Sequence, residues 1–429
     1  MIYEKKTWLD RIAENITGRL LTYEDGSTAL VNVERNEGEI SQEGDAFSGE
    51  NMNDFEERIA TAFDIVDAGR KVISVYDRFL RFSPSNHKAV IIKAGTKIRT
   101  DSGFINFDVD TTCDLSSYIS EAGQDYYVHV DSNGVVIASE NKTESGYTRI
   151  GRFHTLCADV GDDVKMIAPA SPSSGIAVGD KWVVKPYNAD DDPDFYAFYN
   201  KDVTKVTVQS NYDVIECVHP LSGYKAGEIL PESIFCLTFR PECMFDDAMV
   251  YEKTLDIACD VYLQSGTSIN TRSKFNATHT VNRKYYNIQQ DFLQVGKRCL
   301  SDEEFTLCAI GSNEKTAIQG ASDKGTVGGH VDTAGRRMIS AIGVEEMCGY
   351  LWQVLRDTAP TGGSGWVTTD GHASFGQEYG DPHVLIAGAG WSYSASCGSR
   401  SCIRALCVLI PLRTLVGVGR AELDVGCKM

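Results

Sequence analysis

The sequence predicts an α+β protein in which β-rich N-terminal modules precede a C-terminal domain that also contains helices. Gly, Ser, Thr, Asp and Asn recur at short intervals through the first half, which favours short strands joined by turns. Asn133 and Gly134 separate two β-rich runs, and this pair is the strongest short signal of a hairpin. In the second half, Ser301 followed by Glu304 indicates an N-cap and a helix start.

The chain is too long for one ordinary core, since it has 429 residues and a domain usually has about 100–200. Within the first segment, Asn53 and Glu56 predict the start of a helix. The proline- and glycine-containing stretch near residue 170 and the acidic run that follows it indicate a connection. We therefore expect a helix-containing segment (1–80), a small β domain (81–165), a linker and β-rich connecting region (166–250) and a C-terminal domain (251–429).

Charge and hydropathy exclude two classes of partner. The net charge of −19 would repel a phosphate backbone, so we expect no nucleic-acid partner. The N-terminus lacks the apolar core of a signal peptide, and no run reaches the roughly 18 apolar residues that span a bilayer. We therefore expect synthesis in the cytoplasm and no membrane insertion.

The thirteen cysteines fit neither a disulfide framework nor a zinc site, because they are odd in number and include no C-x-x-C pair. His219 and the cysteines around it match no metal-ligand spacing. The histidines and acids of the last domain form neither a ligand triad nor a regular calcium loop. We expect no metal and no cofactor; the residues weighed in the last domain are His330, His372, His383, Asp370 and Asp381.

Four segments in the second half resemble, in order, the signatures of one fold family. Residues 298–305 resemble the Arg-Leu-Ser/Thr-x-x-Glu-aromatic helix start of formylglycine-generating-enzyme-type C-type-lectin-like domains. Residues 325–329 resemble their glycine-rich loop, residues 349–352 their Gly-x-x-Trp segment, and residues 398–400 their Gly-Ser-Arg stretch. The resemblance implies a C-type-lectin-like domain over residues 251–429.

Residues 387–421 resemble the variable region of target proteins of diversity-generating retroelements, the family that includes phage receptor-binding proteins of the major-tropism-determinant type. Error-prone copying of asparagine codons in that family cannot produce Lys, Glu, Gln, Met or Trp, and none of these occurs from Ser392 to Ala421. A buried segment would also exclude most of them, but it would exclude arginine too. Four arginines lie inside the segment: Arg400, Arg404, Arg413 and Arg420.

This resemblance implies a receptor-binding protein at the tip of a phage or prophage tail fibre. It implies a homotrimer that joins other tail proteins through its N-terminus and binds a host-cell receptor, either protein or glycan. Two alternatives stay open. Cys397 and Cys402 have the spacing of the redox pair in formylglycine-generating enzymes, which would make the chain an oxidase. A purely structural tail protein is the other alternative. Because a reactive thiol needs a lowered pKa and a substrate groove, we expect no enzyme.

The ligand surface is expected where the family varies. Tyr393 and Arg404 are the expected anchors, because tyrosine and arginine are enriched among residues that dominate interface energetics. Trp352, Trp391 and Leu351 are expected in the scaffold, since their large apolar area suits a core. The complete set of predicted contact residues is Ser392, Tyr393, Ser394, Ala395, Ser396, Cys397, Cys402, Ile403, Arg404, Leu406 and Val408.

Overall fold

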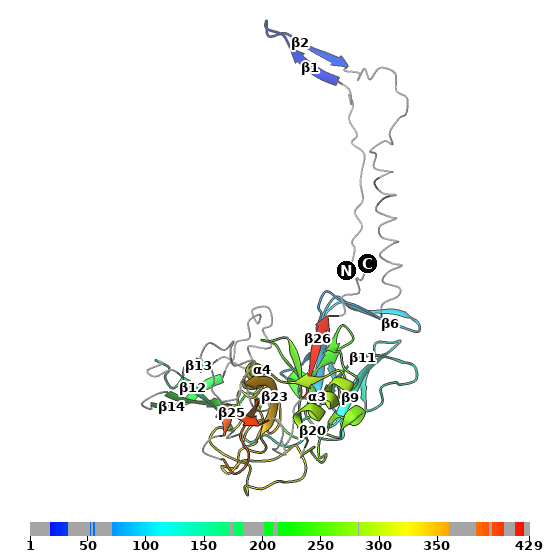
Figure 1. Ribbon diagram of the computed structural model, residues 1–429. Coiled ribbons are helices and arrows are strands. Elements are labelled where there is room, and N and C mark those ends of the chain that lie inside the picture. Colours follow the sequence, from blue (N-terminus) through cyan, green and yellow to red (C-terminus); the bar gives the residue numbers. More distant parts are fainter. Residues whose placement is uncertain are drawn as a thin grey trace, which may run out of the picture. The chain divides into compact units, whose positions relative to one another are not determined.

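The contacts of the chain divide it into two compact units, Met1–Val75 and Tyr76–Met429. In the first unit, β1 (Gly18–Thr22) and β2 (Thr28–Asn32) form an antiparallel hairpin, drawn in blue in Figure 1, and β3 covers Val72–Ile73. The computed structural model describes residues 18–32, 52, 55, 71–162, 164–170, 175–182, 201–208, 213–281, 283–359, 383–393, 397–406 and 417–423.

The helix predicted in the first segment is described at two residues. Met52 and Phe55 are both helical, so the helix already includes the residue before the predicted N-cap. Asn53 and Glu56 themselves lie outside the described residues.

A nine-stranded sheet is the largest element of the second unit, and it draws strands from most of the chain's length. The C-terminal strand β26 lies between β17 and β19, which precede it by more than a hundred residues, and pairs with both antiparallel. Segments expected as separate domains therefore share one sheet. Its order is β10 (Val136–Ser139), β9 (Asp125–Asp131), β11 (Tyr147–His154), β16 (Phe235–Cys236), β17 (Phe239–Pro241), β26 (Gly417–Leu423), β19 (Ile257–Asp260) and β18 (Met249–Glu252), with β22 (Arg298–Cys299) also on β26.

The predicted hairpin at Asn133 and Gly134 is confirmed. Strands β9 and β10 pair antiparallel on either side of it. The Asp131 carboxylate accepts hydrogen bonds from the backbone N–H groups of Asn133 and Val135, both at 2.8 Å. Gly134 has φ +85°, a left-handed conformation that glycine adopts without steric cost. Local side-chain chemistry therefore fixes this turn.

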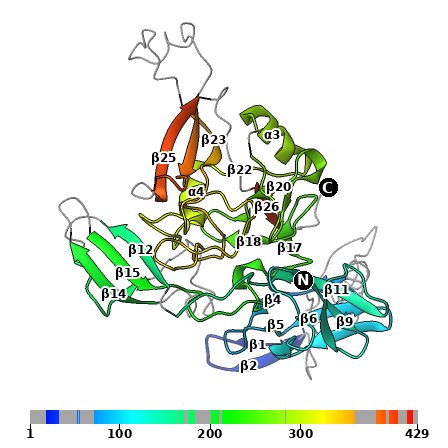
Figure 2. The same cartoon turned by 90° about the horizontal axis from the view of Figure 1, so that it is seen from below.

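Smaller sheets and helices complete the second unit, and Figure 2 shows them from below. The described part of the second unit has two α-helices, and no helix among the described residues of the chain is long and apolar enough to cross a bilayer. The sheets are β4 (Leu80–Phe82) with β5 (Ala89–Ile92) and β8 (Thr111–Asp114); β6 (Thr96–Thr100) with β7 (Gly103–Phe107); β12 (Lys165–Ala170), β15 (Asp213–Val218), β14 (Lys201–Val208) and β13 (Lys181–Trp182); β20 (Gln264–Ser265) with β21 (Arg272–Ser273); and β23 (Gln353–Ala359), β24 (His383–Gly388) and β25 (Gly398–Leu406). The helices are η2 (Pro231–Ser233), η3 (Ser268–Asn270), α3 (Tyr285–Gln294) and α4 (Asp302–Cys308).

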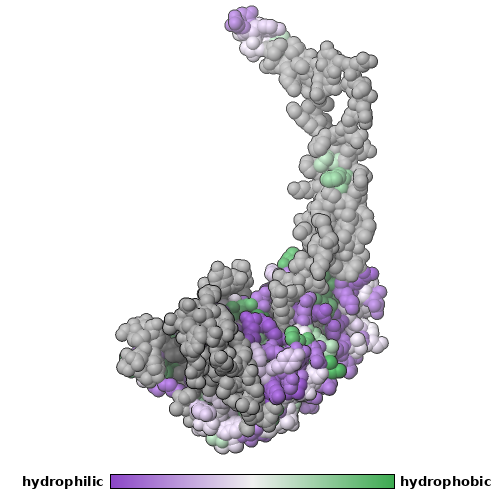
Figure 3. Space-filling model, viewed as in Figure 1, coloured by the Kyte–Doolittle hydropathy of each residue, from purple (hydrophilic) through white to green (hydrophobic). Residues whose placement is uncertain are grey.

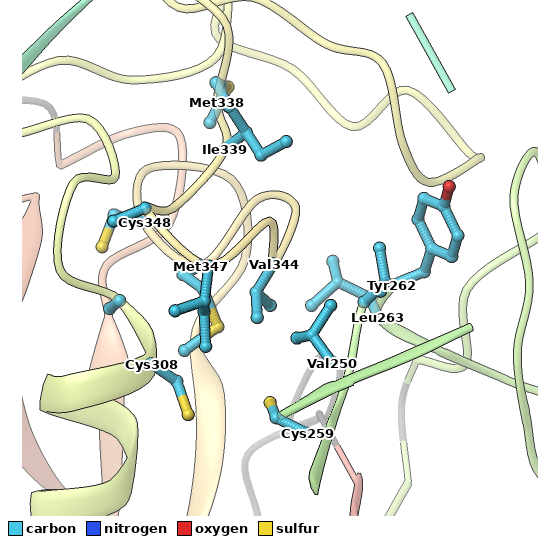
Figure 4. Packing of buried hydrophobic residues seen from close by; sticks show 14 of the residues in the cluster. Val250, Cys259, Tyr262, Leu263, Cys308, Met338, Ile339, Val344, Met347 and Cys348 are labelled. Atoms are coloured by element: carbon cyan, nitrogen blue, oxygen red, sulfur yellow. The ribbon is translucent and has the colours of Figure 1, made fainter. Parts of the chain in front are cut away.

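The main core lies between strands of the large sheet, α4 and the loop segment that follows α4. Figure 4 shows side chains from these three sources pointing toward one another. Each fully buried aliphatic or aromatic side chain contributes about 1.5–3 kcal/mol to folding. Outside this core, the described surface in Figure 3 is mainly hydrophilic, as the many charged residues lead one to expect. The core residues labelled in Figure 4 are Val250, Cys259, Tyr262, Leu263, Cys308, Met338, Ile339, Val344, Met347 and Cys348.

Candidate ligand-binding site

The predicted contact residues that the structure describes lie just after β24 or in and beside β25, in the sheet formed by β23, β24 and β25. Strand β24 lies between the other two and pairs antiparallel with each. The register places Ile403 opposite Ile386 and Cys402 opposite Ala387, but Gly398 opposite Gly388, so β25 carries an irregularity at this point. Such irregularities change the direction of a strand and are frequent beside binding sites.

Strand β24 is buried on both sides, which makes it a rigid support. Val384 and Ile386 pack in one cluster with Phe292 of α3. Ala387, which points to the opposite face because neighbours along a strand alternate, belongs to the main core, and Leu385 packs against that core. The strand next to β25 is therefore held by packing from two directions.

The Gly349–Trp352 segment, which carries the Gly-x-x-Trp resemblance, anchors the end of β24. The N–H of Gly349 donates to the carbonyl of Gly388 at 2.9 Å. Gly349 has φ +76°, and an added Cβ would lie 2.5 Å from the carbonyl oxygen of Thr316. Only glycine fits this position, because a side chain would meet backbone at a distance that real contacts do not reach.

The Gly-Ser-Arg segment is fixed by an acid that the sequence does not single out. The carboxylate of Glu314 accepts hydrogen bonds from the N–H of Ser399 at 3.0 Å and from its hydroxyl at 2.8 Å. A Cβ on Gly398 would lie 2.0 Å from the same carboxylate. The contacts of Glu314 therefore account for the glycine and the serine of this segment. The side chain of Arg400 lies outside the described residues.

Tyr393 is exposed at the end of this scaffold. Its side chain is 54% exposed, and its ring meets the ring of Trp352 edge to face with centroids 5.6 Å apart. Its N–H donates to the carbonyl of Gly390 at 3.0 Å, which closes the turn after β24. Ser392 is exposed beside it. A hydrophobic ring that is open to solvent but held by a tight turn is suited to contact a ligand.

The three predicted scaffold residues differ in burial. Leu351 is fully buried in the main core. Trp391 is half-buried and packs against that core, and its N–H donates to the carbonyl of Tyr350 at 3.0 Å. Trp352 is also half-buried and packs against two smaller clusters, so it joins the scaffold to Tyr393.

Cys397 lies in the interior, which argues against its predicted contact with a ligand. The side chain is 3% exposed and packs with Ala317 and Ala389, and its thiol donates to the carbonyl of Tyr393 at 3.2 Å. Burial, with Glu314 nearby, raises the pKa of the Cys397 thiol to about 11. A redox nucleophile needs a lowered pKa. The geometry therefore disfavours the oxidase alternative.

The remaining predicted contact residues are placed as follows. In β25 the backbone of Arg404 lies opposite Leu385 and that of Leu406 opposite His383. Ser394, Ala395, Ser396 and Val408 lie outside the described residues, as do His372, Asp370 and Asp381. The imidazole of His330 is hydrogen-bonded to the buried carboxylate of Glu346 and lies against the ring of Tyr350, so His330 has a place in the loop packing.

The predicted helix start at Ser301 is confirmed and lies directly under the sheet, since α4 packs against β23, β24 and β25. The Ser301 hydroxyl accepts from the N–H of Glu304 at 3.1 Å, and the Glu304 carboxylate accepts from the N–H of Ser301 at 2.7 Å. Arg298 donates two hydrogen bonds of 2.6 Å to the same carboxylate. The signature thus encodes a reciprocal cap with an added ion pair.

Comparison with known proteins shows the fold. No family model and no curated protein matches the sequence. Solved structures do: the chain resembles a Major Tropism Determinant U1 Variant and an I1 Variant, each with a TM-score of 0.57. The identities are 20% and 19%, over 84% and 82% of this chain and 88% and 86% of theirs.

The comparison confirms part of the predicted fold class, namely a β-rich chain with a C-type-lectin fold, while the predicted order of N-terminal β-rich modules and a C-terminal lectin-like domain stays a prediction. The particular form of that fold is the one of the major tropism determinants. Assignment to the formylglycine-generating-enzyme branch, and the four domain limits, stay predictions.

Proposed function

We propose that this chain is the receptor-binding protein at the tip of a phage or prophage tail fibre, and that the segment from Ser392 to Val408 contacts a host-cell surface ligand. The observation that carries the proposal is the fold of the major tropism determinants over more than four-fifths of the chain. Its N-terminal part would join other tail proteins. The composition of residues 392–421 fits a surface whose residues change between copies of the gene.

The described packing supports a separation of recognition from stability. Leu351 is buried in the main core and Glu314 holds Ser399, whereas Ser392 and Tyr393 are exposed. A ligand surface can then vary while its support keeps the same packing, as in other folds that carry binding loops on a rigid scaffold. In a homotrimer, three such surfaces on one fibre would gain strength by acting together.

Cell binding by purified variants tests the proposal. Tyr393→Ser and Arg404→Ala are each expected to weaken binding to permissive host cells by about thirtyfold or more, the loss expected from a hot-spot residue. The free energy of unfolding of Tyr393→Ser should differ from that of the wild type by less than about 1 kcal/mol, because Tyr393 is exposed. The proposal requires an equally small change for Arg404→Ala. Tyr286→Ser and Arg356→Ala are the matched controls, since both residues are exposed and lie on α3 and β23.

Trp352→Ala is the opposite case. Removing this half-buried ring should cost about 3 kcal/mol of stability whether or not ligand is present. Host cells that bind the Tyr393 and Arg404 variants as tightly as the wild type would refute the proposed surface. Equal loss of stability in all three variants would show that the terminal segment is core.

A further inference from the structure

A cavity lies where three distant segments of the chain meet, and none of its lining residues belongs to the candidate ligand-binding site. Its volume is about 670 Å³, within the range of about 300–1,000 Å³ that is usual for small-molecule sites. The segments are the loop and strand around β11, the end of β17 with the loop after it, and the end of α3. The lining residues that would contact a ligand in the proposal below are Lys142, Arg149, Arg240, Glu242 and Met244.

The walls of this cavity are unusually basic for so acidic a chain. Lys142, Arg149 and Arg240 line it, against the acids Glu242 and Asp246. Neither Arg149 nor Arg240 makes an ion pair with another described residue. Lys142 is paired with Asp247 at 4.0 Å, so the two guanidinium groups of Arg149 and Arg240 are the cations that can attract an anionic ligand to this cavity.

A buried arginine lies behind this wall. A small adjoining cavity of about 30 Å³ shares Arg149 and Arg240 with the larger one and is also lined by Arg152. Arg152 is 4% exposed, and two carboxylates flank its guanidinium: Nε donates to Asp246 at 2.9 Å and Nη1 lies 3.5 Å from Asp125. Nη1 and Nη2 nevertheless make no hydrogen bond with the described residues. Buried donors without an acceptor are rare in native proteins. The small cavity has room for one water-sized group, such as an oxygen of a bound anion.

The backbone holds these cations in place. Strand β11 has a bulge between Arg149 and Gly151, a feature that redirects a side chain. A Cβ on Gly151 would lie 2.5 Å from the carbonyl oxygen of Phe235. Any residue larger than glycine would therefore clash with the neighbouring backbone at this position. The Arg149 guanidinium and the Lys142 ammonium both lie 5.6 Å from the centroid of the Tyr127 ring. On the opposite wall, the N–H of Met244 donates to the carbonyl of Val295 at 2.9 Å.

We propose that this cavity is a binding site for an acidic sugar. The planar guanidinium groups of Arg149 and Arg240 match the two-oxygen geometry of a phosphate or carboxylate group. Glu242 and Met244 also line the cavity and are exposed. The carboxylate of Glu242 would accept hydrogen bonds from sugar hydroxyls, and the side chain of Met244 would offer an apolar surface to the sugar ring. This site is separate from the variable surface and does not depend on its proposed function.

Calorimetric titration of the full chain tests the site with three sugars: glucose 6-phosphate, glucuronate and neutral glucose. Saturable binding of at least one acidic sugar, and none of glucose, is expected. Arg149→Gln and Arg240→Gln should each weaken that binding by about tenfold or more, the effect of losing one charge-assisted pair. Arg99→Gln is a stringent control, because Arg99 is exposed on the nearby β6 and carries the same charge but does not line the cavity.

The result also identifies the acidic group, since tighter binding of glucose 6-phosphate or of glucuronate assigns a phosphate or a carboxylate. Circular dichroism of each variant checks that the fold is intact, and Arg149→Lys, which keeps the charge but loses the planar fork, should bind with intermediate affinity. The proposal fails if neither acidic sugar binds, or if both glutamine variants bind like the wild type. Inorganic phosphate that binds as tightly as glucose 6-phosphate would remove the sugar from the proposal.

Discussion

Residues 349–352 and 390–393 are direct neighbours, yet they serve opposite purposes. The backbones of Tyr350 and Gly390 form a parallel bridge. Tyr350 is fully buried, whereas Tyr393, three residues beyond that bridge, is 54% exposed. A tyrosine therefore belongs to the buried scaffold in one segment and to the exposed surface in the other. The difference shows that this fold changes from core to exposed surface within a few residues.

The surroundings of the two tyrosines explain the contrast. The hydroxyl of Tyr350 accepts from the N–H of Lys324 at 3.1 Å and donates to Asp323 at 3.1 Å, and His279 and His330 flank its ring. Burial raises the pKa of Tyr350, so it stays protonated. By comparison, the ring of Tyr393 contacts Trp352. Replacing Tyr350 would break a network, and replacing Tyr393 would break a single ring contact.

Gly388→Ala should have the largest effect and would sharpen the comparison from the scaffold side. Gly388 has φ +83°, and a Cβ there would lie 2.2 Å from the carbonyl oxygen of Met347. We expect a loss of about 4 kcal/mol, more than backbone strain alone produces, because the backbone has to shift. Chemical denaturation measures it. Gly325→Ala is the matched control, since Gly325 has φ +76° but nothing within 4 Å, and should cost about 1 kcal/mol.

The cap of α4 should have an intermediate effect. Ser301→Ala removes the acceptor for the N–H of Glu304 and should cost about 1 kcal/mol. Burial raises the pKa of Glu304, but the hydrogen bonds from Arg298 and Ser301 outweigh it, so the pKa lies below its ordinary value of 4.5. The ionised carboxylate therefore stabilises the fold above that value, and this contribution is lost as the pH falls through the native pKa.

Glu304→Gln tests this sign. The difference in unfolding free energy between wild type and variant should be greatest near about pH 7 and shrink below about pH 4. Urea titrations across that range measure it. A difference that stays constant or grows as the pH falls would contradict the lowered pKa.

Local chemistry explains which parts of the fold the sequence could predict. The hairpin at Gly134 and the cap at Ser301 depend on residues within a few positions of each other, and both are confirmed. The pairing of β26 between β17 and β19 depends on contacts across more than a hundred residues. No periodicity within one segment specifies such a partner. For this reason the sequence did not predict that strands from three of the expected domains share one sheet.

The candidate site shows the same limit. Resemblance pointed to Tyr393, which is exposed, and also to Cys397, which is buried four residues later. Glu314 and the basic cavity were missed, because each brings together residues from distant parts of the chain. Glu314 and Ser399 are 85 positions apart, and the cavity is lined by residues from three separate segments. Glu314 lies between two other charged or polar residues in a loop and carries no local signal. Only the folded chain brings it to Ser399.

The last prediction concerns the reactivity of the Cys397 thiol and disturbs the fold least, because no residue is replaced. It tests how close the buried core comes to the exposed Tyr393. The raised pKa and the burial of its thiol predict slow alkylation, since the thiolate is the reactive form and reagent has to reach it. Peptide mass spectrometry after a short iodoacetamide pulse on the native protein should find Cys397 largely unlabelled, and labelling should become complete in urea. Unfolded chain provides the control for intrinsic reactivity. Rapid labelling of native Cys397 would place its thiol on the surface beside Tyr393. It would then extend the candidate ligand-binding site into a position that the packing with Ala317 and Ala389 assigns to the interior.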